Sequence, residues 1–374
     1  MIKRISSLLL ALALAVVCFI ACDNRKDNGT DTTLETSAET TVITEQNTSL
    51  SDINQSYTGE YTPPQNYTYP NGCVFTLNED KLSYTLSEYT GTQSDLVIPA
   101  LVYNTPVTAI ASNVFSLCKT LKSVVVSEGI TDIGSGAFQQ CSALVSVSLP
   151  STLIDLGRNT FILCTSLKSL DIPEGVTKIK WNLLYGCSSL ESVTIPSTVT
   201  EIDSYVFDDC GSLKSIRIPK SVGLIGKGIV RGCSSLESIT VEDGNARYHS
   251  RGDCLIDTEA KTVIGGCKTS VIPTDSSVET IGKEAFRALS TLTYIFIPDT
   301  VKLIDTSAFA DCAELTEITV GSGLQTVEAM AFEGCEKLAE VTYNGSEEDW
   351  SNIEISIKNE FLISAAKHYA KIVE

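Results

Sequence analysis

Apolar residues recur along most of this chain at a fixed step of 23 residues. An aromatic or aliphatic residue keeps this step, and a cysteine follows it three positions later in nearly every case. The cysteines are Cys118, Cys141, Cys164, Cys187, Cys210, Cys233, Cys312 and Cys335, and the aromatic residues are Phe115, Phe138, Phe161, Phe207, Phe286, Phe309 and Phe332. A period of this length predicts a solenoid of stacked repeats.

Each repeat, which we call a coil, reads in three parts. Residues 190–195 alternate between apolar and polar side chains and predict a short strand, which Pro196 ends because it has no N–H for a ladder. A polar stretch with apolar residues at Val199 and Ile202 follows. The last part carries the Phe and Cys positions, is too short for an independent helix, and is expected to form a helical or 3₁₀ turn.

One coil cannot bury its own apolar side, whereas stacked coils bury like side chains against one another. We therefore predict a right-handed, β-rich solenoid with short helical turns and one long parallel sheet. The cysteines become small, buried residues of a ladder, and their column cannot offer the tetrahedral arrangement that zinc requires. Cys254 and Cys267 lie outside the column and could form a disulfide.

One coil is longer than the others, because the step from Leu236 to Leu292 is 56 residues. The additional residues lie within 242–273, where residues 254–257 and 261–264 have the pattern of two short strands around a polar turn. We predict a hairpin that protrudes from the solenoid or caps one of its coils.

The N-terminal residues have the pattern of a targeting signal. Lys3 and Arg4 precede an apolar run that ends at Ala21, so residues 1–21 are predicted to be a signal peptide. Ala21-Cys22 resembles a lipobox, which predicts lipidation of Cys22; the alternative is ordinary secretion. Residues 22–72 are acidic and rich in Thr and Ser, and are expected to be a disordered spacer.

Net charge and histidine content exclude several classes of function. The formal charge of −19 argues against nucleic acid as a partner. His249 and His368 are the only histidines, and no phosphate loop or nucleophile elbow occurs, so we expect no enzyme and no cofactor. The acidic cluster at 347–349 could perform acid–base chemistry, but a solvated turn in a C-terminal cap (346–374) is favoured.

The repeats resemble the BspA-like leucine-rich repeats of bacterial surface proteins. The motifs are residues 167–176 (LKSLDIPEGV) and 133–138 (IGSGAF), and the match runs from about Cys73 to Tyr343, within a solenoid assigned to residues 73–345. Leu184 and Val230 replace Phe, and Leu289 replaces Cys. The resemblance implies a leucine-rich-repeat solenoid that acts as an adhesin or receptor.

We therefore expect a non-catalytic lipoprotein on the outer face of a bacterial membrane, attached through its N-terminal lipid. Its ligand would be an extracellular protein or glycan, such as a host matrix protein. The alternative is a structural envelope protein that mediates self-association or contact between cells.

Side chains that point outward from the predicted strands are the candidate ligand-binding residues. They are Asp171, Thr194, Arg217 and Thr240 in the N-terminal half, and the aromatic pair Tyr294 and Phe296 further on. The aromatic pair could instead pack beneath the predicted hairpin.

Arg251-Gly252-Asp253 spells the integrin-binding tripeptide on an expected loop. Arg251 and Asp253 are therefore candidate ligand residues. The competing explanation is coincidence, because a given tripeptide is a weak signal alone.

The stacking hypothesis predicts that buried and outward positions differ in stability. Phe138→Ala removes a core ring and should lower the free energy of unfolding by about 3–5 kcal/mol. Thr194→Ala on the outward row should change it little. Thermal melts check the pair, and two equally mild changes would show that the facing is misassigned.

Overall fold

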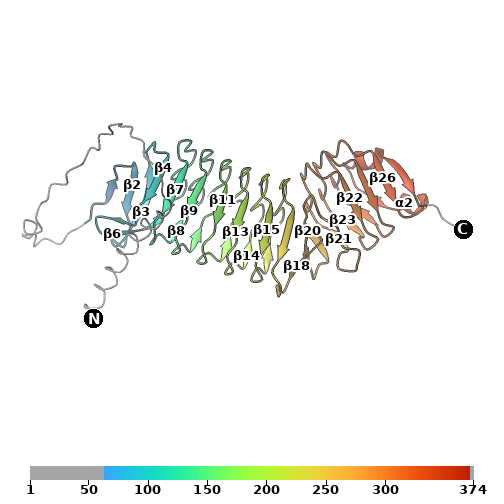
Figure 1. Cartoon of the computed structure of the whole chain (residues 1–374), viewed down its shortest axis with the longest axis horizontal. Coiled ribbons are helices and arrows are strands. Elements are labelled where there is room, and N and C mark those ends of the chain that lie inside the picture. The colour runs from blue at the N-terminus through green and yellow to red at the C-terminus, as the bar shows by residue number, and fades with distance from the viewer. Residues whose placement is uncertain (1–62, 371–374) are drawn as a thin grey trace, which may run out of the picture. The chain divides into compact units, whose positions relative to one another are not determined.

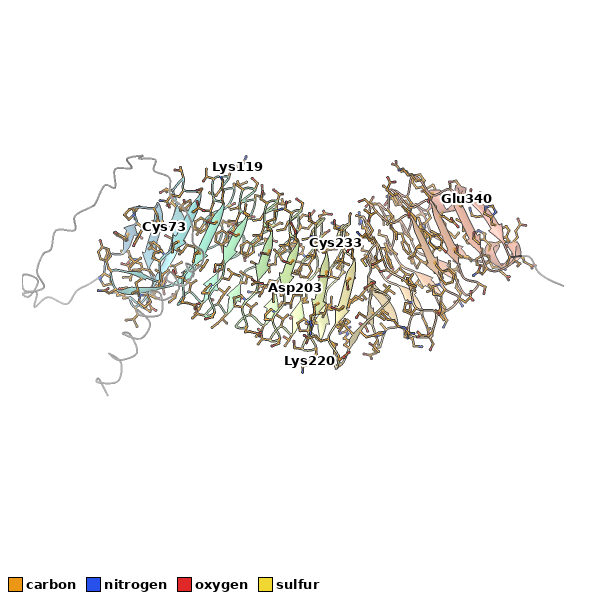
Figure 2. All side chains as sticks on the ribbon, viewed as in Figure 1. Cys73, Lys119, Asp203, Lys220, Cys233 and Glu340 are labelled. Atoms are coloured by element: carbon orange, nitrogen blue, oxygen red, sulfur yellow. The ribbon has the colours of Figure 1, made fainter. Side chains whose placement is uncertain are left out.

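The computed structural model describes residues 63–370, so residues 1–21, Cys22 and most of the predicted spacer lie outside the described part (Figure 1). Within residues 63–370 the chain winds through successive coils, and each coil places short strands beside those of the next coil. Lys119 and Lys220 mark opposite edges of this array in Figure 2.

The first ladder is built from the alternating segment of each coil, as expected. Its strands pair in parallel one period apart, so that Leu170 faces Val193 and Ile216 faces Ile239. The strands are β4 (Asp95–Ile98), β7 (Ser123–Val126), β9 (Ser146–Ser148), β11 (Ser169–Asp171), β13 (Ser192–Thr194), β15 (Ser215–Ile218), β17 (Ser238–Val241), β22 (Tyr294–Ile297), β24 (Glu317–Val320), β26 (Glu340–Tyr343) and β28 (Ala366–Tyr369).

A second parallel ladder accompanies the first. It is made by the stretch that holds Val199 and Ile202 in one coil and by its equivalents in the others. This stretch contributes two residues per coil, and the sequence did not predict a strand there. Two residues are too few to show an alternating pattern. The strands are β8 (Asp132–Ile133), β10 (Asp155–Leu156), β12 (Lys178–Ile179), β14 (Glu201–Ile202), β16 (Leu224–Ile225), β21 (Thr280–Ile281), β23 (Leu303–Ile304), β25 (Thr326–Val327) and β27 (Glu354–Ile355).

The segment with the Phe and Cys positions is a run of tight turns, and the helical turn expected there does not form. Gln140 and Leu163 have φ near +58°, and such left-handed residues cannot continue a right-handed helix. Every second N–H instead donates to the next coil: Phe138 N to Thr160 O at 2.9 Å and Gln140 N to Ile162 O at 2.7 Å. Backbone hydrogen bonds therefore connect adjacent coils on a third side as well.

The folded part begins earlier than the predicted boundary at Cys73. β1 (Asn66–Thr68) pairs antiparallel with β2 (Cys73–Leu77), which pairs with β3 (Tyr84–Tyr89). β3 continues into the second ladder through β6 (Thr105–Ile110), which also pairs with β5 (Leu101–Val102). Tyr67 and Tyr69 pack against the core, and this apolar contact orders residues that had been assigned to the spacer.

The long coil neither protrudes from the stack nor caps it. β18 (Tyr248–Arg251), β19 (Cys254–Asp257) and β20 (Thr262–Gly265) run antiparallel, and β20 pairs in parallel with β21 of the second ladder. All four side chains of β19 are buried, so these strands had to lie within the core. Tyr248 Oη accepts a hydrogen bond from Ile225 N at 3.0 Å. Ile225 belongs to β16, where the run of paired strands β12, β14 and β16 ends.

The C-terminal residues add one more coil. α2 (Glu347–Ser351) and α3 (Glu360–Ser364) separate β26, β27 and β28, and both ladders gain a strand. The acidic cluster has a structural role here. Ser346 Oγ accepts from Asp349 N at 3.0 Å while Asp349 Oδ2 accepts from Ser346 N at 3.1 Å, which forms a capping box at the start of α2.

Phenylalanine rings form stacked columns in the interior. Phe115 and Phe138 lie 4.8 Å apart and nearly parallel, and Phe138 and Phe161 lie 5.5 Å apart. A second column joins Phe286, Phe309 and Phe332. Leu184, Phe207 and Val230 occupy this position between the two columns in sequence, and the buried residues divide into two clusters at the long coil.

The cysteine column is held by hydrogen bonds as well as by burial. The Sγ of Cys141 donates to Phe115 O at 3.0 Å, and the Sγ of Cys187 donates to Phe161 O at 3.1 Å. The same bond recurs at Cys164, Cys210, Cys233, Cys312 and Cys335. The thiol supplies a donor that an aliphatic residue of similar size would lack.

The described cysteines are all free thiols, including Cys254 and Cys267. Burial raises the pKa of Cys187 to about 12, so its thiol stays protonated and can donate. Cys335 is raised to about 12 for the same reason, which makes these groups poor nucleophiles at neutral pH.

Alkylation of the native protein checks this arrangement. Among the described cysteines, half-buried Cys118 should react first with iodoacetamide, and the buried column should react only after unfolding. Peptide mass spectrometry after timed labelling measures this order, with Cys118→Ser as the control that removes the fast site. Comparable labelling of Cys187 and Cys118 in the native protein would contradict the burial of the column.

Candidate binding surface

Four of the predicted site residues lie together on the first ladder. Asp171, Thr194, Arg217 and Thr240 are exposed and follow one another through four successive coils. Asp171 faces Thr194 across the ladder, and Thr194 Oγ1 donates to Asp171 Oδ1 at 2.5 Å. Arg217 faces Thr240 in the same way.

Exposed serines run beside these residues, two positions earlier in each strand. They share the strand position that precedes the inward-facing Val, Leu or Ile, and they are Ser146, Ser169, Ser192 and Ser215. We call the serines together with Asp171, Thr194, Arg217 and Thr240 the first-ladder strip. Adjacent strands lie about 4.8 Å apart, so the strip offers hydroxyl and charged groups at a regular spacing.

Arg217 is a highly exposed charge of the strip, with 75% of its side chain accessible. Its guanidinium lies 2.9 Å from Glu242 Oε1, which leaves other N–H donors directed to solvent. The pKa of Glu242 is held below its usual value by the backbone N–H of Lys220 and then by Arg217. This end of the strip therefore stays charged at neutral pH.

The aromatic pair lies apart from the strip. Tyr294 and Phe296 are on β22, which follows the long coil in sequence and pairs with β24. Tyr294 is 47% exposed and its hydroxyl donates to Thr319 Oγ1 at 3.1 Å, whereas Phe296 is half-buried. The exposure of Tyr294 contradicts the alternative that it packs beneath the hairpin.

Arg251, Gly252 and Asp253 occupy the tight turn between β18 and β19. Gly252 and Asp253 have φ of 56° and 53°, as a two-residue hairpin turn requires. Arg251 forms an ion pair with Asp275, and Val271 N donates to Gly252 O at 2.8 Å. The tripeptide is therefore attached to the neighbouring segment, and its arginine already has a carboxylate partner.

A pocket on the second-ladder side was missed by the sequence analysis. It has a volume of about 380 Å³ and is lined by Ser135, Arg158, Lys178, Lys180, Trp181 and Asp203. Trp181 is 44% exposed and stands one period after Arg158. The signal in the sequence is a Trp and an Arg at the same position of adjacent repeats, which lies outside the alternating first strand of each coil.

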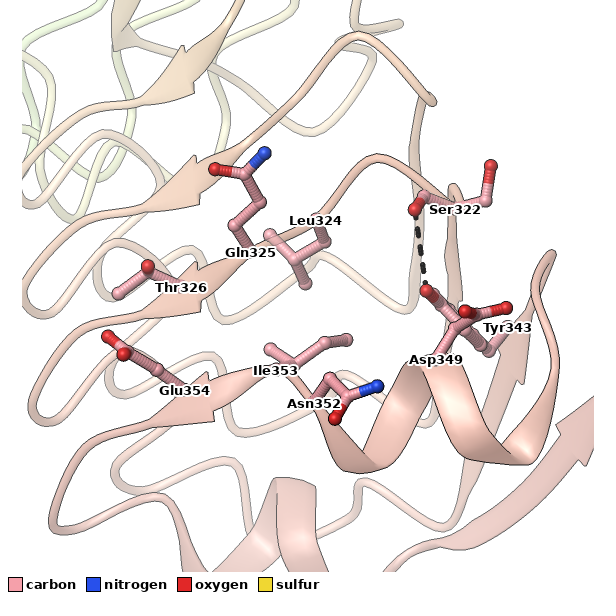
Figure 3. A pocket seen from close by; sticks show the side chains of 9 residues that line it. All are labelled: Ser322, Leu324, Gln325, Thr326, Tyr343, Asp349, Asn352, Ile353 and Glu354. Carbon is pink, nitrogen blue, oxygen red and sulfur yellow. Dashed lines mark hydrogen bonds between the residues drawn. The ribbon is translucent and has the colours of Figure 1, made fainter.

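A larger pocket of about 480 Å³ lies between β25, β27 and α2 (Figure 3). Tyr343 Oη donates to Ser322 O at 3.4 Å across it, and Asp349 is engaged in the capping box. Because these two polar groups stabilise the last coil, we assign this pocket to the architecture of the C-terminal cap.

Buried Asp208 and half-buried Arg231 form an ion pair, one period apart, that the sequence did not predict. Asp208 is fully buried, and Arg231 Nε donates to its Oδ1 at 2.8 Å. Burial raises the pKa of Asp208 to about 6, and Arg231 offsets this effect only in part. Glu284, whose Oε2 is buried and accepts no hydrogen bond among the described residues, raises it further.

The pH dependence of stability tests this buried carboxyl. Folded Asp208 holds its proton up to pH about 6, whereas the unfolded carboxyl loses it near about 3.9. Relative to Asp208→Asn, the wild-type free energy of unfolding should therefore fall as pH rises from about 4 to about 7. Urea unfolding at several pH values measures the difference, with exposed Asp132→Asn as control. A difference that rises with pH would show that Arg231 dominates instead.

Within residues 63–370, no group of three or more His, Cys, Asp or Glu side chains is arranged to hold a metal ion. The helices of this part are also too short or too polar to cross a bilayer.

Two solved structures resemble this fold over most of its length. A leucine-rich cell surface protein of Faecalibacterium prausnitzii A2-165 is 26% identical, with a TM-score of 0.55, and the alignment covers 78% of this chain and 98% of that one. The pneumococcal vaccine antigen PcpA is 18% identical, with a TM-score of 0.61 and coverage of 82% and 88%, which supports the fold alone. The comparison with curated proteins gave no match.

The family model described as the BspA type leucine-rich repeat region matches in six copies, over residues 94–211, 156–251 and 261–357. These ranges contain the Phe columns, the whole Cys column and most of the repeated strands described above. The chain therefore belongs to the BspA-type leucine-rich-repeat family of bacterial surface proteins.

Proposed function

We propose that this protein is a non-catalytic binding protein of the bacterial surface that presents the first-ladder strip to an extracellular protein or glycan. The observation that carries the proposal is the exposure of hydroxyl and charged side chains at one strand position through consecutive coils. Such a row can contact an extended ligand at many points, and each contact would contribute only a small part of the binding free energy.

The strip has the properties of a polar recognition surface. Asp171 and Arg217 place opposite charges two coils apart, and serine and threonine hydroxyls fill the positions between them. Hydroxyls both donate and accept hydrogen bonds, which suits peptide groups and sugar hydroxyls. The similar protein of Faecalibacterium prausnitzii is described as a cell surface protein, which supports the proposed location.

We also propose that Cys22 carries the lipid that attaches the protein to the membrane. The support is sequence alone: a basic start, an apolar run and the Ala21-Cys22 junction. The acidic Thr- and Ser-rich residues that follow would extend by self-repulsion and hold the solenoid away from the membrane. We do not include integrin among the proposed ligands, because Arg251 is paired with Asp275.

A binding comparison on the two sides of the solenoid tests the proposed function. The mature chain is screened against matrix proteins and glycans, and the double variant Asp171→Ala, Arg217→Ala should bind its ligand at least about tenfold more weakly. Both residues are exposed, so stability should be nearly unchanged. The matched control is Asp132→Ala, Lys227→Ala, which removes one acid and one base from the other side.

Two outcomes would count against this function. Unchanged binding in the strip variant would place the ligand elsewhere, and the absence of any ligand across the panel would remove the binding proposal. If ultracentrifugation instead shows self-association that the strip variant abolishes, the structural envelope role would be supported.

A further inference from the structure

We propose that the pocket beside Trp181 binds a pyranose sugar that carries a carboxylate, such as a uronic or sialic acid. This inference deepens the proposed binding function and rests on it, but it concerns the opposite side of the solenoid from the first-ladder strip. Asp203, one of the lining residues, is labelled in Figure 2.

The stacking of coils explains the hollow. Gly157 stands one period before Lys180, and a Cβ on Gly157 would lie 2.5 Å from Ser135 N. Glycine is therefore required there by the close approach of the preceding coil, whose Ser135 lines the pocket. The volume of about 380 Å³ is in the range of small-ligand pockets, about 300–1,000 Å³.

Trp181 is not required for packing between coils. The same position holds Ser135, Arg158, Ser204 and Lys227 in neighbouring coils, all of which are polar. An indole that is 44% exposed at a solvent-facing position leaves apolar surface in water. The flat apolar face of a pyranose ring can cover such a surface, as aromatic side chains at binding sites commonly do.

Arg158 provides the charge that a carboxylate would need. Lys180 is paired with Asp155, and Lys178 lies 2.9 Å from Glu201 and 3.1 Å from Asp203. These lysines are therefore neutralised by the protein itself. Exposed Arg158 has no ion-pair partner within residues 63–370, although the whole chain carries a charge of −19.

Guanidinium and carboxylate match geometrically, because two parallel N–H groups can donate to the two oxygens. Ser135 and the carboxylate of Asp203 lie in the same lining and can hydrogen-bond sugar hydroxyls. The combination of one exposed indole, one unpaired guanidinium and short polar groups favours a monoacidic sugar over a polyanion, which would be repelled by the surrounding acids.

Tryptophan fluorescence of the full chain provides the assay. Trp181 and Trp350 are the only tryptophans, so a Trp350→Phe background reports on the pocket alone. Methyl glucuronide and N-acetylneuraminic acid are titrated as acidic probes, and methyl glucoside is the neutral match of the first. We expect at least one acidic probe to change the Trp181 emission and to bind at least about tenfold more tightly than the glucoside.

Variants separate the two contacts. Arg158→Ala should lower the affinity for the acidic probe to that for the glucoside, whereas Lys227→Ala, an exposed cation in the same row outside the pocket, should leave it unchanged. Trp181→Ala, followed by ligand-observed NMR, should abolish binding of both sugars. Both pocket residues are exposed, and circular dichroism and melting temperature confirm that each variant is folded.

Several results would overturn the inference. Equal affinity for acidic and neutral sugars, unchanged affinity in Arg158→Ala, or no binding of either acidic probe at millimolar concentration would each do so. Failure here is distinguishable from failure of the proposed function. A ligand whose affinity depends on Asp171 and Arg217 but not on Arg158 would support the first-ladder strip and exclude the pocket as the binding site of that ligand.

Discussion

The fold depends on one repeated contact, in which a carbonyl accepts two hydrogen bonds at once. Phe138 O accepts the N–H of Cys141 in its own coil at 3.2 Å and the thiol of Cys164 in the next coil at 3.1 Å. The first bond shapes the turn, and the second joins the coils. Because both end on one buried oxygen, each coil must return to the same place, which requires a constant coil length.

Two consequences follow from this constraint. The backbone N–H and C=O groups of the coils are hydrogen-bonded within the ladders, so the outward side chains can change without affecting the stack. Coils that share the same interior therefore carry different outward groups, such as Ser135, Arg158 and Trp181 at one position. A repeat family can in this way keep its core and change its ligands.

The long coil shows what happens when the constraint is relaxed. Between Cys233 and Leu289 the period is lost, and Gly232 N donates to Arg287 O at 3.1 Å across the junction between the turns on its two sides. The two apolar clusters meet there, and the ion pair of Asp208 and Arg231 lies beside this junction with buried Glu284. The ring position itself is aliphatic in this part of the stack, at Leu184 and Val230.

The sequence by itself determined the period, the buried columns and the outward row at Asp171 and Thr194. These features depend only on which residues repeat and on the alternation of a strand. The tertiary structure decided the second ladder, the place of the long coil and the pocket at Trp181. A two-residue strand is too short to show a periodic pattern. In a short segment, the sequence of a buried hairpin strand resembles that of an exposed one. The pocket depends on which side chains of adjacent coils meet, because its lining residues come from successive coils.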